Sequence, residues 1–391
     1  MIITSEGIVI ILMTVFFFII TLNIQSAFLY LLISLLLSIL LINIIYPYVT
    51  LGGIEIKRIS ISRCYEGEVF SVSLLVKNIS KYRKYLFNIE DTVPLPEKKK
   101  REIFFVSVLN PLEELEFTYK APGIKRGIYT FPPIRISSRA PFGIFQASRI
   151  GRESGENRLV IYPGIYNIRN AFFMGEGRSE MAYETTDVKS GHSMEFLGVR
   201  EFNPGDSLRF IHWPSTVKHR KLIVKEFSYE ASPPVTILID SNNKVQKGVG
   251  KEGTFEYSLR FAATLLVYLN KEKNNFNLLV SHKQENLSSS IVFEEILLSM
   301  AGFNTEGNSP IGDIIEKIIP NLSYGSDLII FTPDISFREY DFKSLLSRVA
   351  SIRVLFLHSS ENISLKSHNM RMFTYSEGDN PERVLIKLFA R

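Results

Sequence analysis

The chain is poor in the side chains that most often carry covalent, redox or metal chemistry. Cys64 is the only cysteine among the 391 residues, so no disulfide can form within the chain. The six histidines include no HExxH pair, and the sequence has neither a G-x-S-x-G nucleophile motif nor a P-loop. We therefore expect a protein that is not an enzyme and needs no cofactor. A hydrolase with an unfamiliar set of residues is the enzymatic alternative.

The chain also lacks a strong excess of charge of either sign. Its 45 basic and 40 acidic residues give a formal net charge of +5 and a pI near 9.0. A nucleic-acid binder would concentrate far more positive charge on one face, so we expect no nucleic-acid partner. The mild excess suits an anionic membrane surface, and a single cysteine fits a reducing compartment.

Charged residues are nearly absent from the beginning of the chain. Residues 7–22 and 27–46 contain none, and each run approaches the roughly twenty apolar residues that cross a bilayer as a helix. The short segment 23–26 predicts a tight turn between two membrane-spanning helices, which makes the lipid bilayer the first expected partner. A secretory signal peptide is the alternative. It fits less well, because a basic n-region is missing and a second apolar run follows at once.

The first cations of the chain indicate its orientation in the membrane. No lysine or arginine precedes Lys57, and Arg58 and Arg63 follow it closely. The positive-inside rule then places the soluble part in the cytoplasm, together with the N-terminus. We therefore expect a cell-membrane protein with two spans, residues 1–50, and cytoplasmic soluble domains.

The sequence pattern of residues 51–150 is typical of an all-β domain. In residues 68–78 the apolar positions are Val69, Val72, Leu74 and Val76, an alternation that slips near Ser71. Further β-rich runs separated by turn formers cover residues 85–89, 103–109 and 115–119. Short strands at this spacing predict a β-sandwich-like domain.

Residues 232–391 change to alternating strands and helices. Continuous apolar runs, which are typical of parallel strands buried on both faces, occupy residues 235–239, 276–280, 328–331 and 354–357. Helical periodicity covers residues 255–269, 311–319, 342–349 and 381–389, the last with Asn380 as N-cap and Pro381 at its first position. This alternation predicts a doubly wound α/β domain, joined to the β-rich domain by a connecting region, residues 151–231.

The connecting region contains the most informative segment, residues 196–227. It holds the only tryptophan, Trp213, and a turn at residues 204–206 flanked by charges. One interpretation is structural: Trp213 anchors the segment to the α/β core, and arginine–carboxylate pairs fix the turn. The other interpretation is a surface that contacts a partner.

This segment resembles a known family, catalogued as domain of unknown function fifty-eight (DUF58). The family pattern G-x-R-E-[FY]-x-P-G-D-x-x-R-x-I-x-W is matched by Gly198, Arg200, Glu201, Phe202, Pro204, Gly205, Asp206, Arg209, Ile211 and Trp213. The resemblance extends to Asn78, to residues 91–94 and to the P-F-G turn of residues 141–145. The chain departs from the family at Ala140, Pro214 and Arg220.

The resemblance implies an α/β domain similar to von Willebrand factor A domains, whose metal site has the pattern D-x-S-x-S after the first strand. Here the strand is followed by Asp240 and Asn242, and Lys244 stands in place of the second serine. Asp334 matches the later aspartate, and a hydroxyl would come from Thr305 or Ser309. Oxygen ligands of this kind suit Mg²⁺, but the lysine predicts a degraded site.

The resemblance also implies a partner. It suggests a membrane-tethered adaptor that works with a MoxR-type AAA+ ATPase in the assembly or maturation of other proteins. The alternative is an outward-facing adhesion-like module that binds a protein through a divalent ion. The sequence gives no indication of the oligomeric state.

Overall fold

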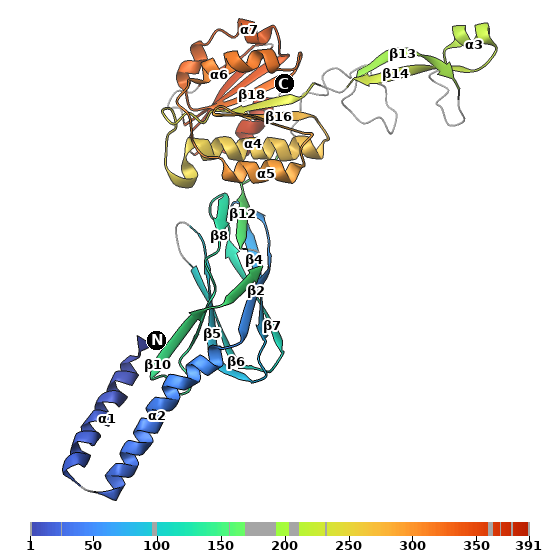
Figure 1. The fold of residues 1–391 in the computed structure, drawn as a ribbon. Helices are drawn as coiled ribbons and strands as arrows, with labels where there is room; N and C mark the ends of the chain where they lie inside the picture. The colour runs from blue at the N-terminus through green and yellow to red at the C-terminus, as the bar shows by residue number, and fades with distance from the viewer. Residues whose placement is uncertain are drawn as a thin grey trace. The chain divides into compact units, whose positions relative to one another are not determined.

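The computed structural model describes residues 2–24, 26–95, 100–155, 157–168, 193–202, 211–230, 233–358, 363–367, 369–376 and 378–389. Contacts divide the chain into two compact units, Met1–Tyr162 and Pro163–Arg391. The first unit contains two helices and a β-rich part, and the second contains an α/β sheet and a separate β-hairpin (Figure 1).

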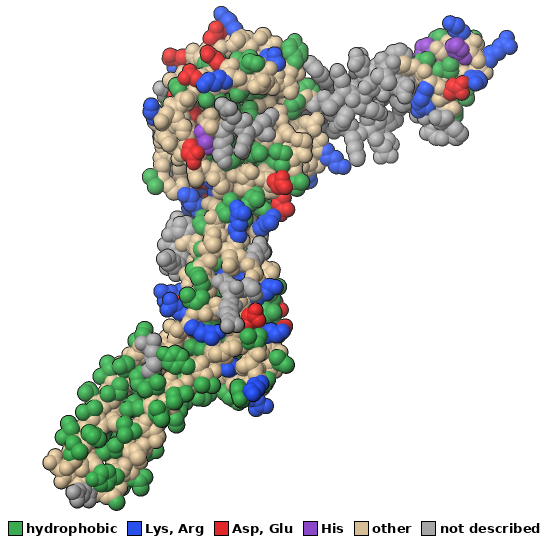
Figure 2. Space-filling view, in the orientation of Figure 1, with side chains coloured by type: hydrophobic (Ala, Val, Ile, Leu, Met, Phe, Trp, Pro, Cys, Tyr) green, Lys and Arg blue, Asp and Glu red, His purple; other side chains and the backbone are tan. Residues whose placement is uncertain are grey.

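The chain begins with two long apolar helices, α1 (Ser5–Asn23) and α2 (Ala27–Leu51). The side chain of Thr4 caps α1 by accepting a hydrogen bond from the Gly7 amide at 3.0 Å. Both helices are long and apolar enough to cross a membrane, and only 17% and 11% of their most apolar windows is buried. Their hydrophobic side chains instead cover the outer surface (Figure 2). The two predicted apolar segments are therefore helices, and α2 continues through Pro47 beyond the expected end.

The β-rich part of this unit is built from short strands. They are β1 (Ile2–Ile3), β2 (Ile54–Ile61), β3 (Cys64–Tyr65), β4 (Val69–Asn78), β5 (Lys84–Val93), β6 (Lys100–Leu109), β7 (Glu114–Pro122), β8 (Gly127–Thr130), β9 (Arg135–Ser138), β10 (Phe145–Ile150), β11 (Arg152–Gly155) and β12 (Arg158–Tyr162). They form sheets in the orders β1-β10-β9-β5-β6, β11-β2-β4-β7 and β3-β12-β8. The first two sheets bury one shared hydrophobic core, which is consistent with the predicted sandwich.

Strand β4 corrects the predicted alternation. Its core-facing residues are Phe70, Val72, Leu74 and Val76, all completely buried, whereas Val69 is 61% exposed. The pattern therefore does not slip, because Phe70 and not Val69 belongs to the buried face. Every second residue from Phe70 points inward, as a regular strand requires.

The second unit contains the remaining elements. Its strands are β13 (Ser193–Glu201), β14 (Ile223–Glu230), β15 (Val235–Ile239), β16 (Phe276–Val280), β17 (Lys283–Ser288), β18 (Asp327–Thr332), β19 (Ser351–Leu357), β20 (Ser364–Lys366) and β21 (Met370–Tyr375). Its helices are α3 (Trp213–His219), α4 (Thr254–Lys271), α5 (Phe293–Gly302), α6 (Ile311–Ile318), α7 (Lys343–Leu346) and α8 (Pro381–Phe389), with short 3-10 helices η3 (Gly250–Glu252), η4 (Ile319–Asn321) and η5 (Ile335–Glu339).

A seven-stranded sheet forms the centre of this unit, in the order β17-β16-β15-β18-β19-β21-β20. The five inner strands are parallel, and the two edge strands are antiparallel to their neighbours. Helices α4 and α5 lie on one side of the sheet, and α6 and α7 lie on the other (Figure 1). Residues of one strand alternate between the two layers: Phe331 stacks on Phe261 of α4, while Ile330 belongs to the core under α6 and α7.

Candidate functional site

The predicted metal-binding residues lie at the carboxyl ends of β15 and β18. These adjacent strands mark the point where the strand order of the sheet reverses, and open α/β sheets bind ligands at such points. Asp240 directly follows β15. Its carboxylate accepts hydrogen bonds from the Thr332 hydroxyl at 2.7 Å and from the Asn242 amide at 3.0 Å. The fold therefore brings the two strand ends together, as a site would require.

Burial has the largest effect on the pKa of the Asp240 carboxyl group. The residue is only 1% exposed, and burial raises the pKa of its carboxyl group, as does the nearby negative charge of Asp334. The hydrogen bonds from Asn242 and Thr332 oppose this rise, because they stabilise the ionised carboxylate. A cation close to the buried Asp240 and the half-buried Asp334 would be favoured, because it would offset both negative charges.

The predicted ligand oxygens are nevertheless engaged in local turns. Asp334 caps η5, with its carboxylate accepting from the Ser336 amide at 3.0 Å and from the Ser336 hydroxyl at 2.6 Å. The Asn242 side-chain oxygen accepts from the amide of the exposed Lys244 at 3.0 Å. The hydroxyl group that donates to Asp240 is that of Thr332 in β18, a residue that the sequence pattern did not predict as part of the site. A metal ion bound by these oxygens would compete with the hydrogen bonds that they already accept.

A second polar cluster lies beside this one, at the carboxyl ends of β15 and β16. The Ser241 hydroxyl lies 2.8 Å from Nδ1 of His282 and 2.8 Å from the Ser281 hydroxyl, and 3.0 Å from the Glu306 carbonyl oxygen. A Glu306 carboxylate oxygen lies 3.5 Å from Nε2 of His282. Serine, histidine and glutamate are the residue types of a hydrolytic triad. Ser241 is completely buried, however, so a substrate carbonyl cannot reach its oxygen.

The segment that resembles the family forms a hairpin. Strands β13 and β14 pair in antiparallel register, with an irregularity between Phe196 and Gly198. Helix α3 follows an N-cap at His212, whose ring contacts the Ser215 hydroxyl at 2.7 Å. Arg220 ends α3 with φ of 53°, a left-handed conformation that terminates helices.

The two departures from the family after the tryptophan therefore have local explanations. Pro214 lies in the first turn of α3, where a missing amide hydrogen costs no helical hydrogen bond. Arg220 occupies the position after the last helical residue, which more often holds glycine.

Trp213 does not anchor this hairpin. Its side chain is 63% exposed, and no described residue of α3 is buried. Within the described part of the chain α3 packs against β14, and the exposed Trp213 is therefore not the anchor to the α/β core that the structural interpretation predicted. The buried residues of the motif region are aliphatic: Ile211, Ile223 and Val224 are at most 7% exposed, and Ile211 bridges to Val224.

The exposed surface of the hairpin combines apolar and cationic side chains. Val217 of α3 is 76% exposed, Leu222 before β14 is 44% exposed, and Lys218 and Arg220 are also exposed. We call Trp213, Val217 and Leu222, with these two cations, the hairpin tip.

The described charged residues of the motif pair within the hairpin itself. Glu201 pairs with Lys221 at 2.9 Å, and both side chains are about two-thirds exposed, so the pair adds little stability. Arg200 donates a hydrogen bond to the Glu201 carbonyl oxygen. Gly198 lies at the irregularity in β13. The expected turn pairs involve Pro204, Gly205, Asp206 and Arg209, which lie outside the described residues.

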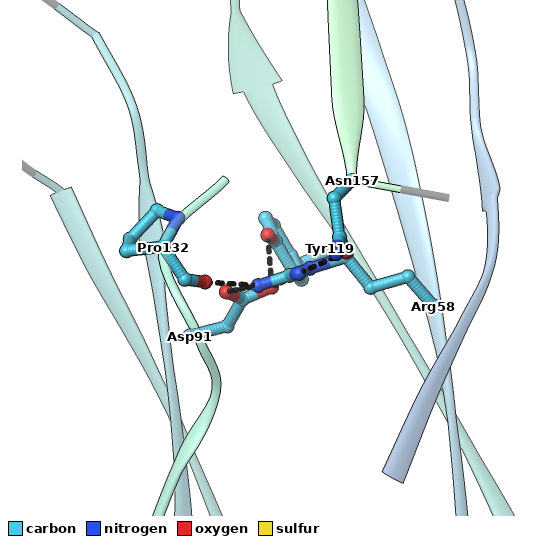
Figure 3. Close-up of polar contacts among 5 residues, drawn as sticks. All are labelled: Arg58, Asp91, Tyr119, Pro132 and Asn157. Atoms are coloured by element: carbon cyan, nitrogen blue, oxygen red, sulfur yellow. Dashed lines mark hydrogen bonds and ion pairs between the residues drawn. The ribbon is translucent and has the colours of Figure 1, made fainter. Parts of the chain in front are cut away.

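Two further family positions, Asp91 and Asn78, have clear structural roles. Asp91 forms an ion pair with Arg58, and both side chains are completely buried in the β-rich core (Figure 3). The guanidinium also donates to Asn157 and to the Pro132 carbonyl oxygen, each at 2.8 Å, while the Tyr119 hydroxyl donates to Asp91 at 2.7 Å. Burial raises the pKa of Tyr119 first, and the adjacent carboxylate raises it further. Arg58 therefore belongs to the core and does not face a membrane.

Comparisons with known proteins match part of the chain. Residues 198–291, from β13 to the loop after β17, match a family described as a protein of unknown function, DUF58. An uncharacterised protein of Bacillus subtilis, YeaD, is 22% identical over 167 residues. That alignment covers 41% of this chain and 41% of YeaD.

Solved structures resemble the chain only weakly. The CARDB domain of the PF1109 protein from Pyrococcus furiosus is 12% identical, covering 28% of this chain and 91% of the domain, with a TM-score of 0.21. A β-glucosidase from Listeria innocua is 15% identical, covering 25% of this chain and 16% of the enzyme, with a TM-score of 0.16. Neither likeness supports a functional conclusion. The hairpin and the first strands of the α/β sheet thus match a family whose function is unknown.

Proposed function

We propose that this protein is a membrane-anchored, non-enzymatic interaction protein whose hairpin tip docks a partner protein. The observation that carries the proposal is the exposure of Trp213 and Val217 on an element that leaves them uncovered. Tryptophan and arginine dominate the binding energy of protein interfaces, because they bury a large surface and fix orientation. A monomer gains no stability from leaving Trp213 and Val217 exposed on the surface of a hairpin.

The hairpin suits docking because its own core is already formed. Ile211, Ile223 and Val224 are buried within it, and the Thr216 hydroxyl accepts a hydrogen bond from the Ile223 amide at 3.0 Å. The helix is therefore held on the strands before a partner arrives. A preorganised surface loses less conformational entropy on binding than a flexible one, which favours affinity.

The partner we propose is a MoxR-type AAA+ ATPase, which the family resemblance implies. Lys218 and Arg220 at the hairpin tip would complement an acidic surface on that partner and steer its approach. In this role the protein would link the ATPase to the membrane and to client proteins during their assembly or maturation.

We propose further that α1 and α2 span the cell membrane and that both units lie in the cytoplasm. The apolar surface of the helices supports the first statement. The absence of lysine and arginine before Lys57 supports the second. A cytoplasmic location is required if an ATP-dependent partner is to reach the hairpin.

The α/β unit would act in this role as a von Willebrand factor A-like domain without a working metal site. The strand order and the placement of Asp240 at the switch point support the likeness. Loss of the metal is supported by the local hydrogen bonds of Asn242 and Asp334. An outward-facing module that binds its ligand through Mg²⁺ is the second candidate. It is favoured by the approach of Asp240, Thr332 and Asp334, and it requires both units outside the cell.

Capture of the intact protein from its native membrane tests the proposed function. Trp213→Ala and Val217→Asp should each abolish co-purification of the ATPase. Val249→Asp is the matched control, because Val249 is 94% exposed and lies outside the hairpin. All three variants should melt like the wild type. Retention of the ATPase by both hairpin variants would defeat the docking assignment.

A further inference from the structure

One end of the β-rich unit is formed by three loops that surround the point where the helices leave. They are residues 79–83 between β4 and β5, residues 110–113 between β6 and β7, and residues 139–144 between β9 and β10. The first of these loops contacts the chain just after α2, where the Ile79 amide donates to the Gly53 carbonyl oxygen at 2.9 Å. We call these three loops the helix-side rim.

The helices are bound to this rim by specific contacts. The Thr4 hydroxyl before α1 donates to the Gly143 carbonyl oxygen at 2.6 Å, and β1 pairs with β10. The Asn43 side chain of α2 accepts from the Phe142 amide at 3.2 Å. A Cβ atom on Gly7 would lie 2.2 Å from the Ile144 carbonyl oxygen, so only glycine permits this approach. These contacts fix the position of the rim along the axes of the two helices.

A single side chain organises the two outer loops of the rim. Asn78 is completely buried, and its amide nitrogen donates to the carbonyl oxygens of Tyr82 at 2.8 Å and of Asn110 at 3.0 Å. Its side-chain oxygen accepts from the Ser80 amide at 3.0 Å. The Leu112 amide donates to the Asn78 carbonyl oxygen at 3.0 Å. Both loops are thus fixed in shape before they meet any partner.

The rim presents apolar and aromatic side chains to the outside. Ile79 is 44% exposed, Tyr82 61%, Leu112 72% and Phe142 61%. Side chains of these sizes are rarely left in water together at one end of a domain. Aromatic residues with one polar end are enriched where a membrane meets water, because the ring lies among the headgroups.

The same rim carries cations that have no carboxylate partner among the described residues. Lys81 and Arg83 are exposed, and neither forms an ion pair with a described residue. The Lys81 ammonium lies 5.3 Å from the centre of the Tyr82 ring. The carboxylate of Glu113 is occupied by the Asn110 amide at 2.6 Å. Figure 2 shows lysine or arginine side chains beside hydrophobic ones at this end of the β-rich unit.

From these contacts we infer that the helix-side rim rests in the headgroup layer of the membrane and binds anionic phospholipid there. The inference depends on the proposed membrane anchoring, because α1 and α2 fix the position of the bilayer relative to the rim. Lys81 and Arg83 would contact lipid phosphates, while Tyr82, Leu112 and Phe142 insert among the headgroups. Cations near an anionic leaflet gain favourable energy, and long cationic side chains can reach phosphates from a backbone above them. The β-rich unit would thus stand on the membrane in one orientation.

Fluorescence quenching in proteoliposomes tests this inference on the intact chain. In a Trp213→Phe background, Leu112→Trp places the only tryptophan on the rim. Val69→Trp is the matched control, because Val69 is 61% exposed at the opposite end of β4, about 30 Å from Asn78. The vesicles contain phosphatidylcholine with or without phosphatidylglycerol, and a trace of lipid with a nitroxide quencher on its headgroup.

We expect the nitroxide to quench the tryptophan fluorescence of the Leu112→Trp variant and to leave that of the Val69→Trp control unaffected. Quenching should be stronger with phosphatidylglycerol, and Lys81→Gln with Arg83→Gln should remove that increase. Equal quenching of the Leu112→Trp and Val69→Trp variants would overturn the inference. Quenching of the Leu112→Trp variant that does not depend on phosphatidylglycerol would also overturn it. A rim that serves a protein partner instead of lipid would give no quenching in these pure lipid vesicles, which would also overturn it.

Flotation of the same vesicles after an alkaline wash separates this result from the proposed function. Protein that floats without quenching is anchored, so only the rim inference fails. Protein that does not float is not anchored, and the proposed membrane span fails with it.

Discussion

The buried ion pair between Arg58 and Asp91 makes a quantitative prediction about the β-rich unit. Both side chains are completely buried, and the guanidinium makes polar contacts with Asp91, Asn157 and Pro132. Asp91→Ala would leave this charge in the core without its counter-ion. Breaking a buried pair by removing one partner costs about 3–5 kcal/mol. Tyr119 would also lose its acceptor, which places the loss toward the upper end of this range.

Thermal melting of the intact protein in detergent measures this loss. Folded domains are stable by about 5–15 kcal/mol, so Asp91→Ala should bring the β-rich unit close to unfolding. For a domain of this size, 3–5 kcal/mol lowers Tm by about 6–20 °C. Asp91→Asn is the informative companion variant, because it keeps the shape of the side chain and removes only the charge.

A double variant distinguishes the charge from the packing. Arg58→Met with Asp91→Leu replaces both charges by apolar groups, which is often neutral for buried pairs. It should melt at a higher temperature than Asp91→Ala, although Tyr119 and Asn157 then lose partners. Melting of Asp91→Ala within about 2 °C of the wild type would refute the reasoning, since even 1 kcal/mol shifts Tm by that amount.

Four further outcomes are expected. Trp213→Ala should change the free energy of unfolding by about 0.5 kcal/mol or less, because the exposed ring covers no core; early melting would restore its role as an anchor. Asn78→Ala should cost about 1–3 kcal/mol in the same assay by leaving buried loop carbonyl groups without their donor. Millimolar Mg²⁺ should not shift Tm, whereas a site occupied at a hundredfold excess over Kd would add about 2.7 kcal/mol, abolished by Asp240→Ala. A reporter fused after Arg391 should be protected from protease in right-side-out vesicles, and its digestion would contradict the cytoplasmic placement.

Local patterns in the sequence predicted the regular elements well. The runs 235–239 and 276–280 are β15 and β16, because central strands of a parallel sheet covered by helices are rich in apolar residues; Thr236 and Asn277 are the polar exceptions. The cap at the last helix is also confirmed, since the Asn380 side chain accepts from the amides of Glu382 and Arg383. The predicted helix 342–349 is shorter, α7 (Lys343–Leu346), although Phe342, Leu345 and Val349 are buried as the periodicity required.

Contacts between distant residues were beyond sequence reasoning. The sequence predicts Arg58 as a cation beside the membrane, but its partner Asp91 lies 33 positions away on another strand. The cluster of Ser241, His282 and Glu306 could not be predicted either, because these residues lie on three loops that meet only when the sheet forms. The anchoring role predicted for Trp213 rests on the tendency of large aromatic residues to lie in a core. The hairpin buries Ile211 instead.

Photocrosslinking from the hairpin tip in native membranes tests the central claim most directly. A photoreactive amino acid replaces Val217, which is 76% exposed on α3, and the same residue replaces Val249 as the control, 94% exposed outside the hairpin. If the hairpin tip docks the ATPase, the probe at position 217 should form a crosslink to it that Trp213→Ala removes, and the probe at position 249 should form none. An ATPase crosslink of equal strength from both positions, or none from position 217, would contradict the account.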